Sequence, residues 1–477
     1  MTLIVQNGSA PTPKGGGQEG RRRRACPGLS APMQTGDGLL VRLMPIGTIP
    51  LAALAKLCAA ARLYGNGIME ITARGNIQVR GLSAASAPRF AAAVAALDLA
   101  AEDSVPVYTD PLAGLTPDEM LDSGKLAVDL RRAVTQRSLA ARLSPKVSVA
   151  IDGGGALGLD QLTADVRLRA EVINGDPALE VSVGGDATNA ATIGLVALAH
   201  GVETAVRLLD VIAQRGRDAR ARDIAREEPA SFRAAISDLF LSPNKPSCPA
   251  SRRTSTSYGN AKDGDGRNIS ERSDAVLRTA MPGHDAGSHS EVIGAHRLRG
   301  GLLAVGLAPV FGHADASSLD DLVEAAQMAG AAGIRTAPAR SLIVIGLASD
   351  ALASFTAAAE RLGFIVRSDD PRRHVVACSG APFCASGHIA ARTVAPAVAE
   401  AVAQFRGDSF TIHVSGCAKG CAHSAPAALT ISGTPDGCAL IADGVARDAP
   451  FAVVGTNELS AAIAKHAHER TQEARHV

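Results

Sequence analysis

The feature that most constrains the fold is an internal duplication. Residues 38–44 read GLLVRLM and residues 301–307 read GLLAVGL, so two similar strand-like segments lie 263 positions apart. Each is followed by a helical run rich in Ala and Leu, by two more strand-like segments and by a second helical run. This order is close to half of a ferredoxin-like unit, so we expect two copies to pair into one pseudo-symmetric domain. The expected elements are helices near 51–63, 86–97, 319–331 and 350–362 and strands near 68–72, 77–79, 334 and 342–345.

A second pair of segments repeats at the same spacing. Residues 149–167 read VAIDGGGALGLDQLTADVR, and residues 412–430 read IHVSGCAKGCAHSAPAALT. Both patterns are typical of a strand, a Gly-rich loop and another strand. The second copy carries Cys417 and Cys421 where the first carries glycine, so only one half supplies thiols. Chance similarity of Ala/Gly-rich sequence is the alternative, but two segments that agree on one spacing favour duplication.

Four cysteines form two short-spaced pairs. Five residues separate Cys378 from Cys384, and three separate Cys417 from Cys421. A four-iron, four-sulfur (4Fe-4S) cluster needs four converging thiolates, and two such loops supply them. A zinc site is the alternative, but its cysteine pairs most often enclose two residues. The sequence therefore predicts one 4Fe-4S cluster on these four ligands.

Composition narrows the class of protein. A net charge of +1, no Trp and only three Tyr argue against nucleic-acid binding. The apolar stretch 39–63 is interrupted by charged residues, and no apolar stretch follows the Arg run 21–24, so we expect neither a membrane span nor an export signal. We expect a cytoplasmic protein with reduced cysteines. Residues 1–25 and 242–292 are expected to be a disordered extension and a low-complexity linker. Three other cysteines are expected to be ordinary thiols: Cys58, Cys248 and Cys438.

Several motifs resemble a known superfamily. The cysteine pairs, HVSGCAKGCAH at 413–423 and ITARGNIQVRGL at 71–82 are similar to the signature of the sirohaem-dependent sulfite and nitrite reductases. Within that superfamily, ACPGLSAPMQTGDGLLVRL at 25–43 and Lys419 in CAKGC resemble the precorrin-3B synthases of aerobic cobalamin biosynthesis. The resemblance leaves the N-terminal extension and the linker outside it.

The resemblance implies a fold class. We expect an α+β, internally duplicated chain whose ferredoxin-like half-domains pair into one domain, accompanied by two α/β domains that form the cluster and tetrapyrrole sites. The expected boundaries are 26–100 and 293–365 for the half-domains, 101–241 for the α/β domain without cluster ligands and 366–477 for the α/β domain with the cluster.

The resemblance also implies a chemistry. Precorrin-3A would be hydroxylated with dioxygen and closed to a lactone, giving precorrin-3B. A mononuclear non-haem iron, NADH as the formal reductant, and an electron-donating reductase or ferredoxin are implied with it. One alternative is a sulfite or nitrite reductase that carries sirohaem. A cluster-bearing electron carrier or redox sensor is another, although such a module needs only a small domain.

A tetrapyrrole polycarboxylate requires basic groups in its pocket, because Arg binds carboxylates bidentately and Lys as a point charge. The residues of one alternating run would point to one face of a strand, although a solvated sheet face is the alternative interpretation. This run comprises Arg74, Asn76, Gln78 and Arg80. Further expected substrate-binding residues are Lys146, Arg340 and Lys419, with Arg335 a weaker counterpart of the run. His423 is expected to act as an acid or iron ligand, while spacing alone leaves the set of non-haem iron ligands open.

Overall fold

The computed structural model describes residues 27–97, 99, 101, 104–241, 291–402 and 410–473. The predictions for residues 1–25, for nearly all of 242–292 and for Cys248 lie outside this described part. Among the described residues, no helix is both long and apolar enough to cross a membrane.

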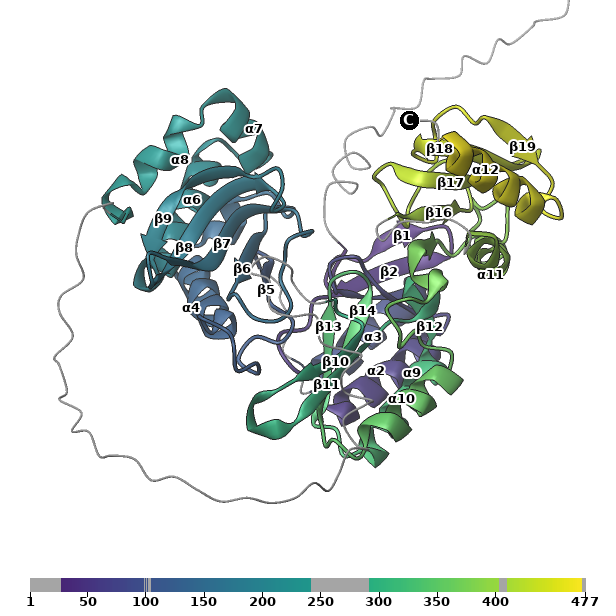
Figure 1. Cartoon of the computed structure of the whole chain (residues 1–477), viewed down its shortest axis with the longest axis horizontal. Coiled ribbons are helices and arrows are strands. Elements are labelled where there is room, and N and C mark those ends of the chain that lie inside the picture. The colour runs from purple at the N-terminus through teal and green to yellow at the C-terminus, as the bar shows by residue number, and fades with distance from the viewer. Residues whose placement is uncertain are drawn as a thin grey trace, which may run out of the picture.

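The two half-domains form one central body with two antiparallel sheets (Figure 1). The first sheet contains, in spatial order, β1 (Met33–Thr35), β2 (Gly38–Leu43), β4 (Ile77–Leu82), β3 (Ile68–Ile71) and β12 (His313–Asp315). The second contains β10 (Gly294–Arg297), β11 (Leu303–Leu307), β14 (Ser341–Leu347) and β13 (Gly333–Ala337). The helices on these sheets are α2 (Leu51–Tyr64), α3 (Ser86–Ala95), α9 (Ala316–Met328) and α10 (Leu352–Arg361).

The half-domains exchange chain segments. Strand β12 belongs to the second half by sequence but pairs with β3 of the first. In return, Ile49 of the first half bridges to Ile334 in β13 of the second. Arg62 at the end of α2 forms an ion pair of 2.8 Å with Asp320 in α9. One hydrophobic core is therefore continuous across both copies, and neither half buries its apolar face alone.

Two α/β domains repeat one mixed topology. In each five-stranded sheet, the third strand pairs in parallel with the second, which pairs in parallel with the first. The fourth strand pairs antiparallel with the third, and the fifth antiparallel with the fourth. The first domain contains β5 (Val107–Thr109), β6 (Val149–Asp152), β7 (Ala164–Ile173), β8 (Asp176–Gly185) and β9 (Ala191–Ala197). The C-terminal domain contains β15 (Val375–Ala377), β16 (Ile412–Ser415), β17 (Ala427–Thr434), β18 (Gly437–Gly444) and β19 (Ala452–Val454).

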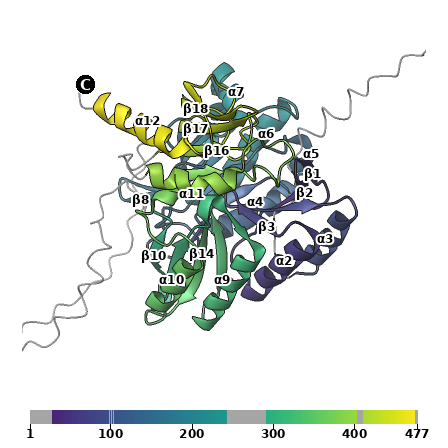
Figure 2. The ribbon, with the colours of Figure 1, turned by 90° about the vertical axis from the view of Figure 1, so that its right-hand side faces the viewer.

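Helices pack against the sheets of both α/β domains. In Figure 1 the two domains lie on opposite sides, above the central body. The first domain has α4 (Ser123–Gln136), α5 (Leu139–Arg142), α6 (Gly201–Gln214), α7 (Ala221–Glu227) and α8 (Ala230–Ala235). The C-terminal domain has α11 (Ala391–Val402) and α12 (Leu459–Glu473), which lie in front of its sheet in Figure 2. Short 3-10 turns are η1 (Leu198–His200), η2 (Ser237–Leu239), η4 (Arg299–Gly301), η5 (Val310–Gly312) and η6 (Pro371–His374).

The duplicated α+β fold is confirmed, since both copies have the expected elements in the same order. One local prediction is wrong. The strands expected near 68–72 and 77–79 are present as β3 and β4, but the alternating run would require Arg74 and Asn76 to share a strand with Gln78 and Arg80, and they lie in the turn before β4. The positive φ of 76° at Gly75 turns the chain between β3 and β4, so the alternating run is split between a turn and a strand.

Candidate functional site

The four predicted cluster ligands come together on two adjacent loops of the C-terminal domain. Cys378 directly follows β15, and Cys417 lies two residues beyond β16. Because β15 and β16 are parallel neighbours, their carboxyl ends open at the same edge of the sheet. The backbone N–H of Cys378 donates to the carbonyl of Val414 at 3.1 Å, which ties the two loops at their roots. Two hydrophobic strands thus determine where the thiols meet.

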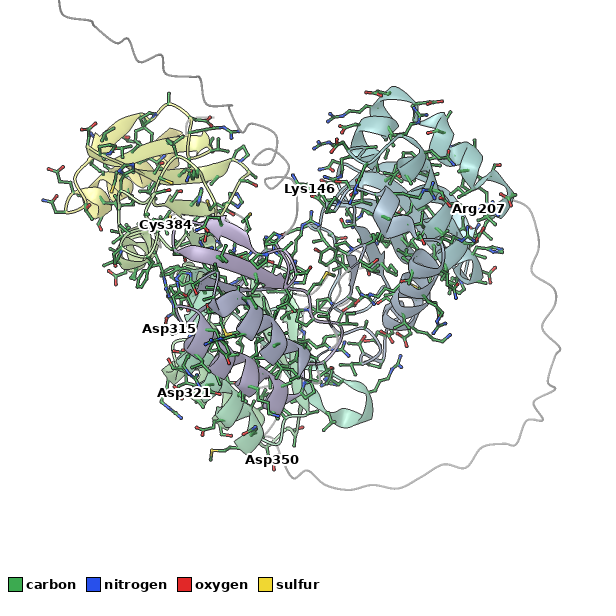
Figure 3. All side chains as sticks on the ribbon, turned by 180° about the vertical axis from the view of Figure 1, so that it is seen from behind. Lys146, Arg207, Asp315, Asp321, Asp350 and Cys384 are labelled. Carbon is green, nitrogen blue, oxygen red and sulfur yellow. The ribbon has the colours of Figure 1, made fainter. Side chains whose placement is uncertain are left out.

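These thiols line a cavity of about 360 Å³ between the C-terminal domain and the central body. Figure 3 shows Cys384 where the C-terminal domain meets the first strands of the chain. The thiols on this wall are those of Cys378, Cys384, Cys417 and Cys421. The opposite wall includes Gly36, Arg42, Glu70, Gln78, Arg80, His313 and Arg340. Residues from both half-domains therefore face the cysteine loops.

The surroundings of the sulfurs suit a cluster. The N–H of Gly416 donates to the Sγ of Cys378 at 3.0 Å, a bond of the kind that tunes a metal-bound thiolate. Gly36 of the central body approaches Cys384 so closely that a Cβ there would lie 2.4 Å from its Sγ. The N–H of Ala385 donates to the carbonyl of Gly36 at 3.0 Å. Small residues thus bring backbone against sulfur on both sides of the cavity.

The thiols also influence one another electrostatically. Burial raises the pKa of Cys378, and the neighbouring Cys417 and Cys384 raise it further. Burial likewise raises the pKa of Cys421, with the other three thiols adding to the effect. Four thiolates at this spot therefore need a compensating cation, which irons would supply.

In the described part of the chain, no three His, Cys, Asp or Glu side chains are arranged to hold a single metal ion. Thiolates that share one zinc all lie about 2.3 Å from it and crowd together. Thiolates of a four-iron cluster each bind a different iron and stand farther apart. Four thiolates are the donor set that such a cluster uses, and the described residues present no group of three donors for a mononuclear iron.

Arg80 is committed to an ion-pair network inside this cavity. Its Nε and Nη2 donate to the carboxylate of Asp37 at 2.8 and 2.9 Å, and Nη1 lies 3.4 Å from Glu70. Burial works to raise the pKa of Asp37, but the hydrogen bonds and charge of Arg80 lower it below its usual value. Gln78, with its amide oriented to satisfy its neighbours, donates to Glu70 at 2.8 Å and accepts from Arg42 at 2.7 Å. The side chains of Gln78 and Arg80, which were expected to bind substrate, thus already form hydrogen bonds and ion pairs with other side chains of the protein.

Arg340 remains a basic group of this cavity without a carboxylate partner among the described residues. Its Nη2 donates to the carbonyl of Ala422, next to Cys421, and its φ of 64° lies in the left-handed region. Burial lowers the pKa of Arg340. His313 is buried on the same wall, where burial first and the charges of Arg392 and Arg340 next lower its pKa to about 3. Its imidazole is therefore neutral at ordinary pH.

The remaining predicted residues are dispersed. His423 does not line the cavity; its ring lies 5.8 Å from that of the buried His413, edge to face. Lys419 lines the cavity and donates to the hydroxyl of Ser386 at 2.8 Å. Lys146 is exposed on the first α/β domain (Figure 3) and lines neither the thiol cavity nor the cavity between the central body and that domain. The substrate-binding and catalytic roles of these residues stay predictions.

A second cavity, of about 270 Å³, lies between the central body and the first α/β domain. Arg74, Asn76 and Arg335 line it, so half of the alternating run faces this cavity rather than the thiols. Sequence reasoning missed four acidic or imidazole groups of the two sites: Asp37, Glu70, Asp110 and His313. No signal in the sequence marks Asp110, because the repeat spacing of 263 positions matches it with Arg373 and not with Cys378.

Comparison with known proteins agrees with this arrangement. A family model described as the nitrite/sulfite reductase ferredoxin-like half domain matches residues 31–97. Sulfite reductase [ferredoxin] 2 of Mycolicibacterium paratuberculosis is 31% identical over 148 residues, which cover 30% of this chain and 27% of that protein. The structure of NirA from Mycobacterium tuberculosis matches with a TM-score of 0.65 at 21% identity, covering 89% of this chain and 79% of NirA, which shows the shared fold.

A much longer match identifies the family. Precorrin-3B synthase of Sinorhizobium sp is 36% identical over 468 residues, which cover 98% of this chain and 93% of that protein. The sulfite reductase match is confined to less than a third of either chain. The chain therefore belongs to the precorrin-3B synthase family.

Proposed function

We propose that the chain is a monooxygenase that hydroxylates precorrin-3A with dioxygen and closes its ring A acetate to a lactone, giving precorrin-3B. One oxygen atom enters the substrate and the other leaves as water, which consumes two electrons and two protons from an external reductant. NADH is the formal source, delivered through a reductase or ferredoxin. The observation that carries this proposal is the meeting of four thiols with arginines of both half-domains in one cavity.

In this proposal, Cys378, Cys384, Cys417 and Cys421 hold one 4Fe-4S cluster, which when bound supplies electrons singly. The N–H of Gly416 supports the charge on Cys378, and the backbone at Gly36 covers Cys384. This cover shields the sulfur of Cys384 from water on one side. We place the reaction in the cytoplasm, where thiols stay reduced until a cluster is assembled.

The arginines orient the substrate. Arg340 is the main candidate to bind a tetrapyrrole carboxylate beside the cysteines, because no described carboxylate pairs with it. Arg80 contributes less than the sequence predicts, since Asp37 already occupies its bidentate face. The neutral imidazole of His313 can hold or release a hydrogen bond without adding charge. No step is assigned to a mononuclear iron, because the described residues do not present a ligand set for one.

The test is anaerobic purification followed by iron, sulfide and tetrapyrrole analysis, and then incubation with precorrin-3A and ¹⁸O-labelled dioxygen. A cluster without sirohaem, together with labelled precorrin-3B, supports the proposal. The alternative, a sirohaem-dependent sulfite or nitrite reductase, is favoured by the sulfite reductase match over part of the chain. Stoichiometric sirohaem and reduction of sulfite or nitrite would decide for that alternative.

A further inference from the structure

The exchanged strand β12 places one histidine on the wall of the thiol cavity. His313 begins β12 and pairs in register with Glu70 of β3, and both residues line the cavity. Directly opposite residues of an antiparallel pair point to the same face of the sheet. The next residue, Ala314, packs on the other face against the hydrophobic core. The second half-domain thus contributes an imidazole to a sheet whose other strands come from the first half.

A hydrogen bond fixes the tautomer of His313. Its Nδ1 donates to the backbone carbonyl of Phe311 at 3.2 Å, and because a carbonyl can only accept, Nδ1 carries the proton. Phe311 and Gly312 have positive φ angles of 60° and 84°, a conformation that is uncommon for a residue such as Phe. This turn brings the carbonyl of Phe311 back to the ring two residues later. A neutral imidazole has one N–H, so Nε2 of His313 is an acceptor.

The surroundings of His313 keep its imidazole neutral. Burial is the main cause, and the charges of Arg392 and Arg340 add to it, so that the pKa of His313 falls to about 3. The carboxylate of Glu70 faces the same cavity from the neighbouring strand, but it already lies 3.4 Å from the guanidinium of Arg80. His313 is therefore an uncharged acceptor surrounded by cations.

The Nε2 atom of His313 has no hydrogen-bond partner among the described residues. It is not sealed inside the protein, in contrast to both ring nitrogens of the buried His413. Since His313 lines the thiol cavity, its Nε2 is open to a ligand there. Apart from the thiols and Glu70, the other ionisable side chains among the described lining residues are all cationic donors: Arg42, Arg80, Arg340 and Lys419. His313 thus adds an open acceptor to a wall that otherwise favours anions.

The turn before His313 also positions Arg340. A Cβ on Gly312 would lie 2.6 Å from the Cδ of Arg340, so the arginine side chain lies directly against the backbone of this turn. Arg340 in turn donates to the carbonyl of Ala422, next to Cys421. The acceptor and the cation are therefore neighbours beside a cysteine loop, where one ligand can contact both.

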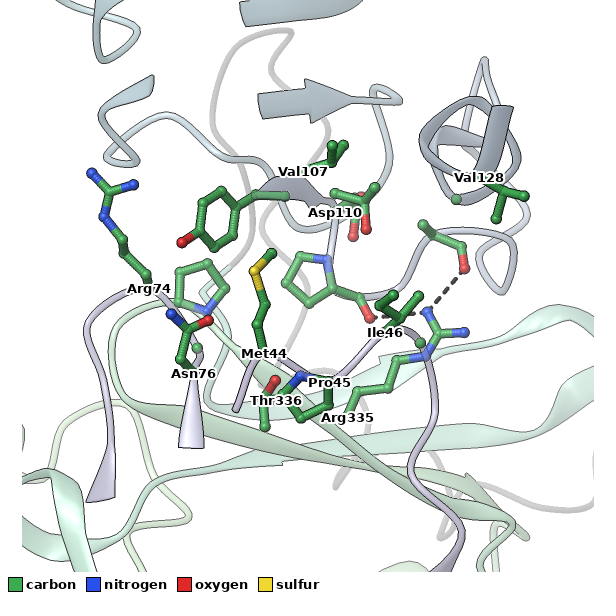
Figure 4. Close-up of a pocket in the computed structure, with 18 of the residues that line it drawn as sticks. Met44, Pro45, Ile46, Arg74, Asn76, Val107, Asp110, Val128, Arg335 and Thr336 are labelled. Atoms are coloured by element: carbon green, nitrogen blue, oxygen red, sulfur yellow. Dashed lines mark hydrogen bonds between the residues drawn. The ribbon is translucent and has the colours of Figure 1, made fainter. Parts of the chain in front are cut away.

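The second cavity offers no such acceptor. Figure 4 shows Arg74 and Arg335 at this cavity, and none of its described lining residues is a histidine. In the repeat, the residue 263 positions before His313 is Pro50, which has no polar side-chain atom. Both cavities therefore have arginines, but only the thiol cavity has an imidazole among its described lining residues.

We propose that Nε2 of His313 accepts a hydrogen bond from a ring N–H of the tetrapyrrole substrate. The inference rests on the proposed function, which supplies the macrocycle. The peripheral carboxylates of such a substrate are ionised at ordinary pH and can only accept, so the ring N–H groups are the donors that it offers to His313. Arg340 binds a carboxylate while His313 binds an N–H, and the two contacts together fix the orientation of the macrocycle beside the cysteines.

The experiment titrates precorrin-3A anaerobically into the full-length, cluster-loaded protein and follows the absorbance of the tetrapyrrole. His313→Leu removes the acceptor and should weaken binding about tenfold, the loss expected for one hydrogen bond. His313→Gln, whose amide can place an oxygen near the position of Nε2, should restore most of the affinity. His296→Leu is the matched control and should bind as wild type. His296 is as buried as His313, lines neither cavity, and uses its Nε2 on the carbonyl of Val292 at 2.8 Å.

A second measurement reads the contact itself. In protein labelled with ¹⁵N-histidine, the resonances that disappear in His313→Gln belong to His313. Without ligand they should show a protonated Nδ1 and a bare Nε2. Addition of precorrin-3A should shift the Nε2 resonance of His313, while that of His296 should stay in place.

The outcomes separate the contact from the proposed function. If wild type binds and converts precorrin-3A but His313→Leu binds it as tightly, the contact is wrong and the function stands. Equal losses in His313→Leu and His313→Gln would also refute the contact, since shape and not an acceptor would then be needed. If wild type neither binds nor converts precorrin-3A, the proposed function fails and the contact fails with it. Should thermal unfolding show that the variants are damaged, the wild-type Nε2 resonance decides, and a resonance that does not move on binding refutes the contact.

Discussion

Arg80 and Asp37 form a two-point ion pair in the wall of the thiol cavity, with Nε–Oδ2 and Nη2–Oδ1 distances of 2.8 and 2.9 Å. Their side chains are only 12% and 3% exposed. Asp37 lies in the turn between β1 and β2, and Arg80 lies in β4, the neighbour of β2, so the pair ties this turn to β4 within one sheet. The pair therefore holds the wall in place, and Arg80 is not a free anion receptor.

Arg80→Ala should consequently lower stability more than it lowers substrate affinity. Removing one member of a buried pair leaves the other charge uncompensated, which costs on the order of 3 kcal/mol. Denaturant unfolding of the protein gives this number directly. The double variant Arg80→Ala with Asp37→Ala should recover part of the loss. A single variant with wild-type stability and strongly weakened tetrapyrrole binding would instead support the direct role that the sequence suggests.

Replacing any one of Cys378, Cys384, Cys417 or Cys421 by Ser should sharply reduce iron and sulfide per chain. A serine oxygen is a harder and poorer donor to iron than a thiolate. Cys438→Ala is the matched control, because this buried thiol belongs to the core of the same domain and lies away from the cavity lining. Full cluster content in Cys384→Ser, or its loss in Cys438→Ala, would refute the ligand assignment.

Gly36→Ala should impair the cluster without touching a ligand. The added Cβ would lie 2.4 Å from the Sγ of Cys384 and 3.1 Å from the N–H of Ala385, so either the loop or the sulfur must shift. Iron content and the visible absorption of the purified protein measure the effect. Gly28→Ala in the same N-terminal segment has no atom within 4 Å of its Cβ and should match wild type.

Much of the fold was predictable because it is local and repeated. Helices such as α2 and α9 follow from apolar periodicity, and the matching spacing of both copies predicts that their elements correspond. The exchange of β12 for the segment around Ile49 was not predictable from sequence. It depends on which sheet edge each short segment meets in three dimensions, and three-residue strands carry little signal of their own.

The site was predictable only where chemistry demands a rare residue. Four cysteines in two close pairs leave few interpretations, so their convergence on one cavity follows from spacing. The alternating run from Arg74 to Arg80 misled, because the turn at Gly75 separates Arg74 and Asn76 from the strand that carries Gln78 and Arg80. Asp37 and Asp110 were missed because an acidic residue is unremarkable in sequence, and only tertiary contacts show that each is buried.

The buried carboxyl of Asp110 should also leave a signature in the stability of the protein without substrate. Its pKa is raised to about 7 in the folded state, against about 3.9 for an unfolded Asp. Between these values the folded protein binds more protons than the unfolded chain, so stability falls as pH rises from about 4 to about 7. Asp110→Asn lacks this titration. Its free energy of unfolding, measured against denaturant at several pH values, should gain on wild type through that window and stay level above it. At about 1.4 kcal/mol per pKa unit, the gain is bounded by roughly 4 kcal/mol. Parallel curves for the two proteins would mean that Asp110 is ionised in the folded state despite its burial.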